Sequence, residues 1–224
     1  MNKIVDYNSD DYHKERHSEF LASKDLNLVW SEFAFHQYFN GLKSSFKVLE
    51  FGGGLGYNLF TANKFYDCHM IEPSEIGRKF AENYGIKTYK DIPELLLKTD
   101  IKFDKILCRH VLEHLKNPLD TLVNLKDLLK EDGELILILP YEKESKPVNK
   151  EIDFHLYCWT PRTACNLLKE AGFNNINYKY NYFTGKKVLI PIYKSLGFTT
   201  YSVIFKILGR IFNSKELQLN AKIR

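Results

Sequence analysis

Apolar and polar positions along the chain form a pattern of short buried strands separated by amphipathic helices. Apolar strands are expected at residues 46–49, 68–71, 86–89, 105–108 and 135–139, with a further candidate at 176–180. Before the first strand, an apolar set recurs at helical spacing: Trp30, Phe33, Ala34 and Tyr38. Because strands alternate with helices, the pattern predicts an α/β fold with a doubly wound, mostly parallel sheet.

Capping signals place the helices between these strands. Ser74 is an expected N-cap for a helix that ends before Gly85. Asn-Pro and Thr-Pro pairs open two further helices, at 117–133 and 160–172. The residues after the first strand, 59–63, are expected to continue as a helix.

The segment VLEFGGGLG, residues 48–56, carries the strongest signal for a ligand. Glu50 ends the strand, and three glycines follow it: Gly52, Gly54 and Gly56. Glycines at such a turn let the backbone approach a nucleotide-like ligand closely. The dinucleotide fingerprint is absent, because its third glycine would fall on Tyr57 or Leu59, so a nicotinamide oxidoreductase is disfavoured. The alternative interpretation is a glycine-rich turn without a ligand.

Polar residues stand at the expected carboxyl ends of the following strands. They are Glu72, Asp91 and the run Cys108-Arg109-His110. Parallel α/β sheets bind ligands at this edge. Glu72 follows Glu50 by 22 residues, close to the spacing at which an acid meets ribose hydroxyls.

These motifs together resemble the class I S-adenosylmethionine (SAM) dependent methyltransferases. The resemblance covers residues 46–180 and includes VLEFGGGLG, IEPS, FDKILCRHVLEHLKNP, LLKEDGELIL and TPRTACNLLKEAGF. The sequence is similar to families that include ubiquinone O-methyltransferases and sugar-modifying enzymes. This similarity implies a Rossmann-like fold with SAM as cofactor and S-adenosylhomocysteine as product.

The resemblance also implies a role for each cofactor residue. Gly52 and Gly54, with Gly56 completing the loop, would pass beside the methionine moiety, and Glu50 would support its amino group. Glu72 would hold the ribose and Asp91 the adenine edge. The far wall of the site would be Cys108 with Arg109.

A hydroxyl acceptor benefits from a general base, and histidine suits this role near neutral pH. The candidates are His110, His114 and His155, of which His110 lies nearest the end of its strand. Each is also open to a packing or capping role.

The run from His110 to His114 reads H-x-x-E-H, which in one class of peptidases marks a zinc site. Pro118 closes this segment too early for the long helix that such a site needs. In ubiquinone-type relatives the position resembles a divalent-metal site of two acids and a histidine, but His110 stands where the first acid would be. Because Mg²⁺ prefers oxygen ligands, we assign no metal ligand from the sequence.

Composition places the chain among ordinary globular proteins, with 224 residues, 44% hydrophobic residues and 27% charged residues. Four cysteines without a C-x-x-C pair, and no apolar signal segment at the start, predict a cytoplasmic protein with reduced thiols. The formal net charge of +4 does not favour nucleic acid as a partner.

The basic character lies in residues 186–224, which hold eight Lys or Arg and one Glu, a net charge of +7. Tyr201, Ile204, Phe205, Leu208, Ile211 and Phe212 form a helical apolar stripe there. Three interpretations stay open: extra core over the substrate cleft, a homodimer surface, and peripheral contact with an anionic membrane through residues 186–212.

The sequence therefore predicts three parts: a helical cap over 1–45, a SAM-binding domain over 46–185 and a basic apolar extension over 186–224. Tyr7, Tyr12 and His17 form either a lid over the cofactor or a disordered start. The expected activity is O-methylation of a small polar, sugar or glycan-precursor acceptor, as in surface polysaccharide biosynthesis. The alternatives are a lipid or quinone-like acceptor at a membrane surface and a non-catalytic SAM-binding partner subunit.

Overall fold

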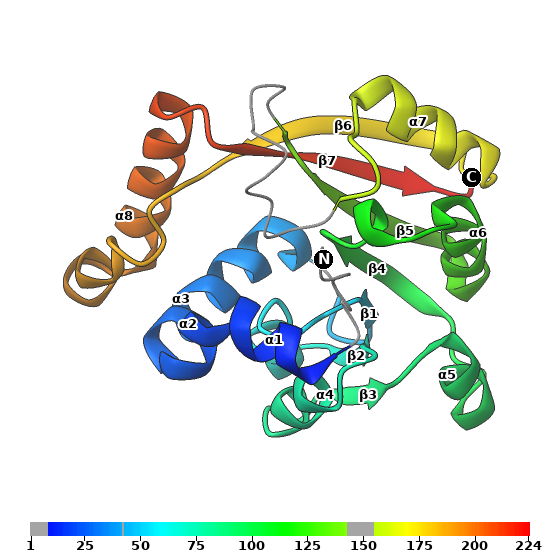
Figure 1. Ribbon diagram of the computed structural model, residues 1–224, viewed down its shortest axis with the longest axis horizontal. Helices are drawn as coiled ribbons and strands as arrows, with labels where there is room; N and C mark the ends of the chain where they lie inside the picture. The colour runs from blue at the N-terminus through cyan, green and yellow to red at the C-terminus, as the bar shows by residue number, and fades with distance from the viewer. Residues whose placement is uncertain (1–8, 42, 143–154) are drawn as a thin grey trace, which may run out of the picture.

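The computed structural model describes residues 9–41, 43–142 and 155–224, except for the side chains of residues 12, 13 and 16. The described residues form a seven-stranded sheet with the order β3-β2-β1-β4-β5-β7-β6. The strands are β1 Lys47–Phe51, β2 Asp67–Ile71, β3 Lys87–Tyr89, β4 Phe103–Arg109, β5 Leu129–Pro140, β6 Asn175–Tyr182 and β7 Lys215–Lys222. The prediction of a doubly wound, mostly parallel sheet is confirmed, and β7 is antiparallel to both of its neighbours (Figure 1).

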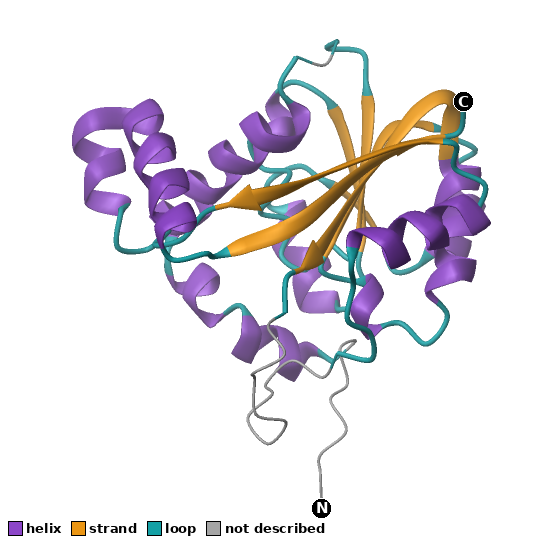
Figure 2. Ribbon diagram, turned by 90° about the horizontal axis from the view of Figure 1, so that it is seen from above, coloured by secondary structure: helices purple, strands orange, loops and turns teal. Residues whose placement is uncertain are grey.

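Helices cover both faces of the sheet (Figure 2). They are α1 Asp10–Arg16, α2 Ser18–Ala22, α3 Lys24–Ala34, α4 Glu75–Glu82, α5 Ile92–Lys98, α6 Pro118–Leu128, α7 Pro161–Glu170 and α8 Ile190–Ile211. Ser74 caps α4 as expected, because its side chain accepts from the Gly77 N–H. Thr160 caps α7 through a reciprocal pair of bonds with Thr163.

Successive strand residues pack into two different cores, because side chains alternate across a sheet. Leu49 and Cys108 face the cluster that includes α5, α6 and α7. Val48 and Leu107 face the opposite cluster, which includes residues of the π-helix Phe35–Phe39 after α3. This alternation explains why the strands read as continuous apolar runs in the sequence.

The expected helix at 59–63 is reduced to a short 3₁₀ turn, Ala62–Lys64. Asn58 is buried and bonded to Glu50, and the Thr61 backbone N–H donates to Ser31 Oγ at 2.6 Å. Because these bonds to other elements fix the positions of Asn58 and Thr61, the segment does not form a regular helix.

The carboxyl-terminal segment is more closely joined to the sheet than the sequence suggested. Residues 215–222 form β7, which lies between β5 and β6 and pairs with both. The predicted boundary at residue 185 therefore separates β7 from the sheet to which it belongs. Only α8 is an addition to the sheet and its covering helices. The sequence pattern missed β7 because this strand is polar at several positions and lies beyond the basic helix.

Helix α8 packs on the cap and lies at the left in Figure 1. Its Tyr201 and Phe205 join Trp30 and Phe33 of α3 in a third core cluster, which confirms that part of the apolar stripe is extra core. Gly197 has a φ of 77° and kinks the helix. Within the described parts of the chain, no helix combines the length and apolarity needed to cross a membrane.

Candidate functional site

The glycine loop follows β1 at the carboxyl edge of the sheet. Gly52, Gly54 and Gly56 have φ values of 71°, 57° and 76°, which other residues rarely adopt. A Cβ atom on Gly52 would lie 2.4 Å from Val111 Cγ2, and one on Gly54 would lie 3.1 Å from His17 Nε2. The loop therefore needs glycine both for its backbone conformation and for the narrow space beside it.

Glu50 lies fully buried behind this loop. Asn58 Nδ2 donates to Glu50 Oε1, and Trp30 Nε1 donates to Asn58 Oδ1 at 2.7 Å. Among the described residues, Glu50 Oε2 has no hydrogen-bond partner. Burial raises the pKa of Glu50 to about 8, against the lowering effect of Asn58 and Arg109. A buried carboxylate oxygen in this position fits a positively charged group such as an ammonium.

Glu72 and Asp91 follow β2 and β3 at the same edge. Glu72 accepts hydrogen bonds from the backbone N–H groups of Gly54 at 2.7 Å and Ser74 at 2.9 Å. Asp91 caps α5 by accepting from the Glu94 N–H at 2.8 Å. Both acids line the central cavity of the molecule. Both carboxylates are thus held at the strand ends by hydrogen bonds from nearby backbone N–H groups.

One cavity of about 780 Å³ collects most of the residues that the sequence singled out. It is lined by eight of the eleven residues predicted to bind the cofactor or to act in catalysis: Gly52, Gly54, Glu72, Asp91, Arg109, His110, His114 and His155. The glycine loop and the two acids form one side, and the histidines extend from the end of β4. This volume is in the range of small-molecule sites.

Three of the expected cofactor residues, Glu50, Gly56 and Cys108, are not among the residues that line the cavity. Glu50 lies behind the loop and is bonded to Asn58, which does line the cavity. Cys108 is completely buried and packs in the core with α6, because the neighbouring Leu107 and Cys108 face opposite sides of β4. Gly56 instead permits close packing, since a Cβ there would lie 2.8 Å from Ala81 Cβ. Gly56 and Cys108 therefore contribute to the packing of the loop and the core rather than to the cavity wall.

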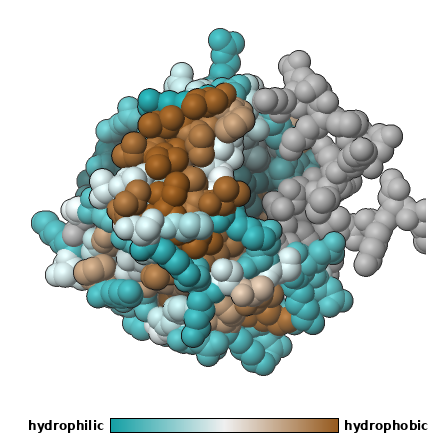
Figure 3. Space-filling view, turned by 90° about the vertical axis from the view of Figure 1, so that its left-hand side faces the viewer, coloured by the Kyte–Doolittle hydropathy of each residue, from teal (hydrophilic) through white to brown (hydrophobic). Residues whose placement is uncertain are grey.

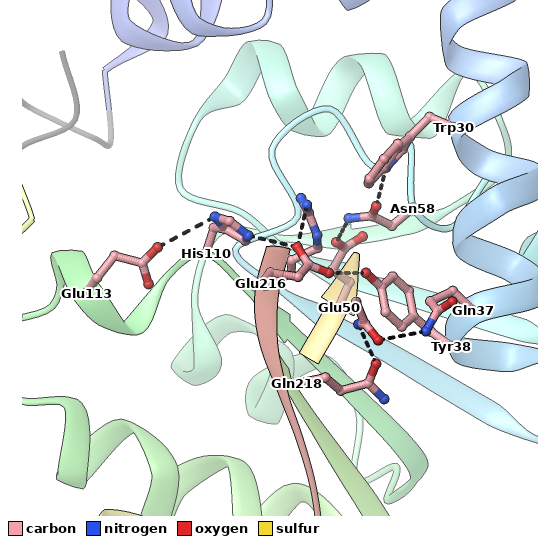
Figure 4. A network of polar contacts seen from close by, with 11 residues as sticks. Trp30, Gln37, Tyr38, Glu50, Asn58, His110, Glu113, Glu216 and Gln218 are labelled. Carbon is pink, nitrogen blue, oxygen red and sulfur yellow. Dashed lines mark hydrogen bonds and ion pairs between the residues drawn. The ribbon is translucent and has the colours of Figure 1, made fainter. Parts of the chain in front are cut away.

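A buried carboxylate from β7, Glu216, joins several elements beside the cavity (Figure 4). Its Oε2 accepts from Arg109 at 2.9 Å and lies 3.1 Å from His110 Nε2, and its Oε1 accepts from the Tyr38 hydroxyl at 2.8 Å. Burial alone would raise the pKa of Glu216, but Arg109 and His110 outweigh it and lower the value to about 2. Glu216 is therefore ionised at neutral pH.

Arg109 is held inside the protein rather than extended along a cofactor wall. Its guanidinium bonds Glu216 and stacks over the Trp30 ring, with 4.9 Å between Cζ and the ring centroid. Burial acts to lower the pKa of Arg109, but Glu216, Tyr38 and Tyr57 together outweigh it and raise the value. Arg109 lines the cavity while tying β4 to β7 and α3.

His110 follows β4 in a left-handed conformation, with φ of 55°, which is rare for a residue other than glycine. Burial by the surrounding protein, together with Arg109, lowers the pKa of His110, although 34% of its side-chain surface remains exposed. The Glu216 carboxylate can accept the Nε2 proton, which leaves Nδ1 able to accept a proton. The ring is thus neutral near pH 7 and suited to general-base chemistry.

Glu113, His114 and His155 form a second polar group on the cavity wall. Their ligand-type atoms lie within 4.8 Å of one another, and Glu113 is completely buried. His155 Nδ1 contacts Glu142. Two imidazoles and one carboxylate could hold a transition-metal ion, a ligand set more suited to such ions than to Mg²⁺. The sequence pattern left His155 apart from the other two residues, and tertiary folding brings it to them.

The cap closes over the glycine loop. The Asp10 carboxylate accepts from the Ser74 hydroxyl at 2.8 Å and from the Ile76 N–H at 3.2 Å, which ties α1 to the start of α4. The Phe20 ring stacks on Tyr57 with 4.3 Å between ring centroids, and His17 lines the cavity. Of the expected lid residues, Tyr7 and the side chain of Tyr12 lie outside the described residues.

Sequence reasoning missed Trp30, Tyr38, Asn58 and Glu216. Three of them are neutral residues within or beside expected helices, where no local pattern separates them from packing residues. Glu216 did carry a signal, because it is the single acid among eight basic residues in the segment 186–224. An isolated carboxylate in a basic segment is a candidate for a buried ion pair.

The comparisons with known proteins agree with this geometry. A family model described as a methyltransferase domain matches residues 23–178. No match was found among curated protein sequences.

Several solved structures share the fold. A SAM-dependent methyltransferase of Thermotoga maritima, described as a possible histamine N-methyltransferase, superposes with a TM-score of 0.64 at 15% identity, covering 95% of this chain and 99% of that one. A SAM-dependent methyltransferase of Archaeoglobus fulgidus gives 0.63 at 18% identity, covering 95% and 100%. Phosphoethanolamine N-methyltransferase 2 of Haemonchus contortus, in complex with phosphomonomethylethanolamine and S-adenosylhomocysteine, gives 0.59 at 14% identity, covering 100% and 62%.

Proposed function

Because this chain belongs to the methyltransferase-domain family and is a SAM-dependent transferase, we propose that it methylates a hydroxyl group on a small polar or sugar-like acceptor. SAM supplies a methyl group on a sulfonium centre, and its transfer requires alignment of the acceptor with that centre. A hydroxyl acceptor additionally needs a base. The observation that carries the proposal is the pairing of His110 with Glu216 at the cavity wall.

In this proposal the glycine loop and three carboxylates hold SAM. Glu50, with its unpartnered Oε2, binds the amino group of the methionine moiety, and Gly52 and Gly54 allow close approach of the backbone. Glu72 binds the ribose, and Asp91 lies beside the adenine. The orphan oxygen supports this assignment, because a buried carboxylate oxygen without a hydrogen-bond partner suits an ammonium group.

His110 acts as the general base in the proposed reaction. Glu216 accepts the Nε2 proton, orients the ring and stabilises the imidazolium that forms when Nδ1 takes the hydroxyl proton, as a carboxylate does for histidine in hydrolase triads. His114 and His155 then position the acceptor on the same wall. The structural neighbours named as N-methyltransferases share only the fold at 14–15% identity, so they do not decide between oxygen and nitrogen acceptors.

Labelled SAM and fractionated cell extract test the proposal. His110→Ala should lower turnover of the acceptor identified in this way by about 10²-fold or more, with SAM affinity unchanged. His36→Ala, at an exposed position of the π-helix Phe35–Phe39 that does not line the cavity, is the matched control. Assays with and without a chelator separate loss of the base from loss of a metal at Glu113, His114 and His155. Unchanged turnover in His110→Ala would remove His110 as the base.

A binding experiment tests the cofactor assignment separately. Calorimetric titrations with SAM, S-adenosylhomocysteine and NAD should show binding of both adenosyl compounds and no binding of NAD. Binding of SAM without methyl transfer to any extract fraction would instead favour a non-catalytic partner subunit. The two experiments therefore distinguish the cofactor site from the acceptor chemistry.

A further inference from the structure

Helix α8 is apolar on two sides. One side, with Tyr201, Phe205 and Gly209, is buried against the cap and the ends of the outer strands. A helix that packs on one side of a globular protein normally presents polar residues on the other. Helix α8 departs from this pattern, so its outer side calls for a separate explanation.

The outer side carries a continuous row of large aliphatic residues. Val203, Ile207 and Ile211 follow one another at four-residue spacing, which places them on one stripe of the helix. Their exposed fractions are 52%, 51% and 68%, and Phe212 beyond them is 66% exposed. Figure 3 views the side of the molecule on which α8 lies and shows hydrophobic residues gathered into a patch. Patches of this kind mark interaction surfaces.

Cations run beside this row. Lys206 and Arg210 are also four residues apart and stand one position before Ile207 and Ile211. With Lys179 of β6 they line a hollow of about 220 Å³ between the helix and the edge strand. Among the described residues, none of these three cations forms an ion pair. Burial and the nearby Lys206 lower the pKa of Lys179, as expected where positive charges gather without acids.

The charge of the surrounding segment is of one sign. Residues 186–212 contain five Lys or Arg and no Asp or Glu. Lys187 and Lys194 pair with acids of the cap, Glu19 and Asp25. Lys206 and Arg210 are exposed, and the Lys206 Nζ lies 5.7 Å from the centroid of the Phe33 ring. An apolar stripe bordered by unpaired cations matches the chemistry of a bilayer surface, where acyl chains lie beneath anionic head groups.

We propose that the outer side of α8 docks on an anionic membrane, with Val203, Ile207, Ile211 and Phe212 in the interface and a head-group phosphate held by Lys179, Lys206 and Arg210. The helix lies along the surface, and the rest of the chain stays in water. This inference is independent of the acceptor chemistry, because none of these residues lines the cavity that we assign to SAM.

Flotation of the full chain with lipid vesicles tests the docking. Wild-type protein should float with vesicles of phosphatidylserine and phosphatidylcholine and stay behind with vesicles of phosphatidylcholine alone. The double variant Lys206→Glu with Arg210→Glu should lower binding by 25-fold or more, since each cation near an anionic surface contributes about fivefold. Ile207→Ser with Ile211→Ser should also abolish flotation, because the apolar contact is lost.

Two matched controls separate this surface from general effects. Arg162→Glu with Lys169→Glu makes the same change of charge on α7, and Leu96→Ser with Leu97→Ser removes two exposed apolar residues from α5. Both controls should float like the wild type. Calorimetric titration of all variants with SAM verifies that each is folded. A variant that binds SAM but not vesicles has lost docking alone, so a failure of docking is distinguishable from a failure of the proposed function.

Other occupants of the patch would give different results. Equal binding of the α8 variants and the wild type to anionic vesicles would overturn the proposal. So would sedimentation of the wild type as a dimer that Ile207→Ser with Ile211→Ser dissociates, without vesicle binding, because the patch would then be an interface between copies of the chain.

Discussion

Nε2 of His110 lies 3.1 Å from Oε2 of Glu216, and the two residues are 106 positions apart in the chain. His110 follows β4, whereas Glu216 is the second residue of β7. Because β7 enters the sheet beside β5, this contact joins the last strand to the cavity wall. The same carboxylate also bonds Arg109 of β4 and Tyr38 of the π-helix Phe35–Phe39, so three elements depend on one buried charge.

Replacing Glu216 with glutamine should strongly destabilise the fold. Glutamine keeps the shape but leaves the buried Arg109 guanidinium without its counter-charge, which costs about 3–5 kcal/mol in comparable buried pairs. Urea unfolding followed by circular dichroism measures the change. Glu131→Gln is the control, because its pair with Arg224 is exposed and should contribute less than about 1 kcal/mol. Equal stability of the two variants would contradict the assigned role of Glu216.

Glu216 should also make the protein sensitive to acid. Its pKa in the folded state is about 2, below the ordinary value near 4.5, so the unfolded chain binds the proton more readily. The stabilisation is present above pH 4.5 and is lost as the pH falls towards 2, with a total of about 3 kcal/mol for a shift of this size. Denaturation curves between pH 6 and pH 3 should fall less steeply for Glu216→Gln than for the wild type.

The raised pKa of Glu50 should appear in cofactor binding. In the protein without ligand this carboxyl has a pKa of about 8 and is mostly protonated at neutral pH. An ammonium group beside it favours the carboxylate, so binding of SAM releases a proton below pH 8. Affinity should rise by up to about tenfold for each pH unit and level off near pH 8.

Calorimetric titrations at pH 6, 7 and 8 measure this dependence on pH. Glu50→Gln should weaken binding and flatten the dependence, whereas His110→Ala should keep it. A flat profile in the wild type would contradict the pairing of Glu50 with the amino group of SAM.

Gly52 and Gly41 offer a matched pair of substitutions. Both have positive φ, 71° and 84°, so alanine at either position carries a similar backbone cost of about 1 kcal/mol. A Cβ at Gly52 would lie 2.4 Å from Val111 Cγ2, whereas nothing lies within 4 Å at Gly41. Gly52→Ala should therefore lower SAM affinity by tenfold or more and Gly41→Ala should leave it unchanged. Similar losses in both variants would indicate backbone strain alone.

Local sequence patterns predicted much of the fold and part of the site. The strand before Gly52, the cap at Ser74 and the acid at Glu72 are signalled by neighbouring residues, because strand burial, capping and turn chemistry act over a few positions. The helix expected at 59–63 was wrong for the opposite reason, since Asn58 and Thr61 bond residues of other elements.

By itself the sequence determined the parallel α/β fold, the glycine loop and the acids and histidines at the strand ends. Tertiary structure decided the insertion of β7, the pairing of His110 with Glu216, the arrival of His155 beside His114 and the burial of Cys108. These features depend on contacts between distant segments, and no short-range periodicity encodes which strand a late segment will join. The burial that folding then imposes sets the charge of Glu50 and Glu216, because a carboxyl group acquires its pKa only from the groups that surround it in the folded chain.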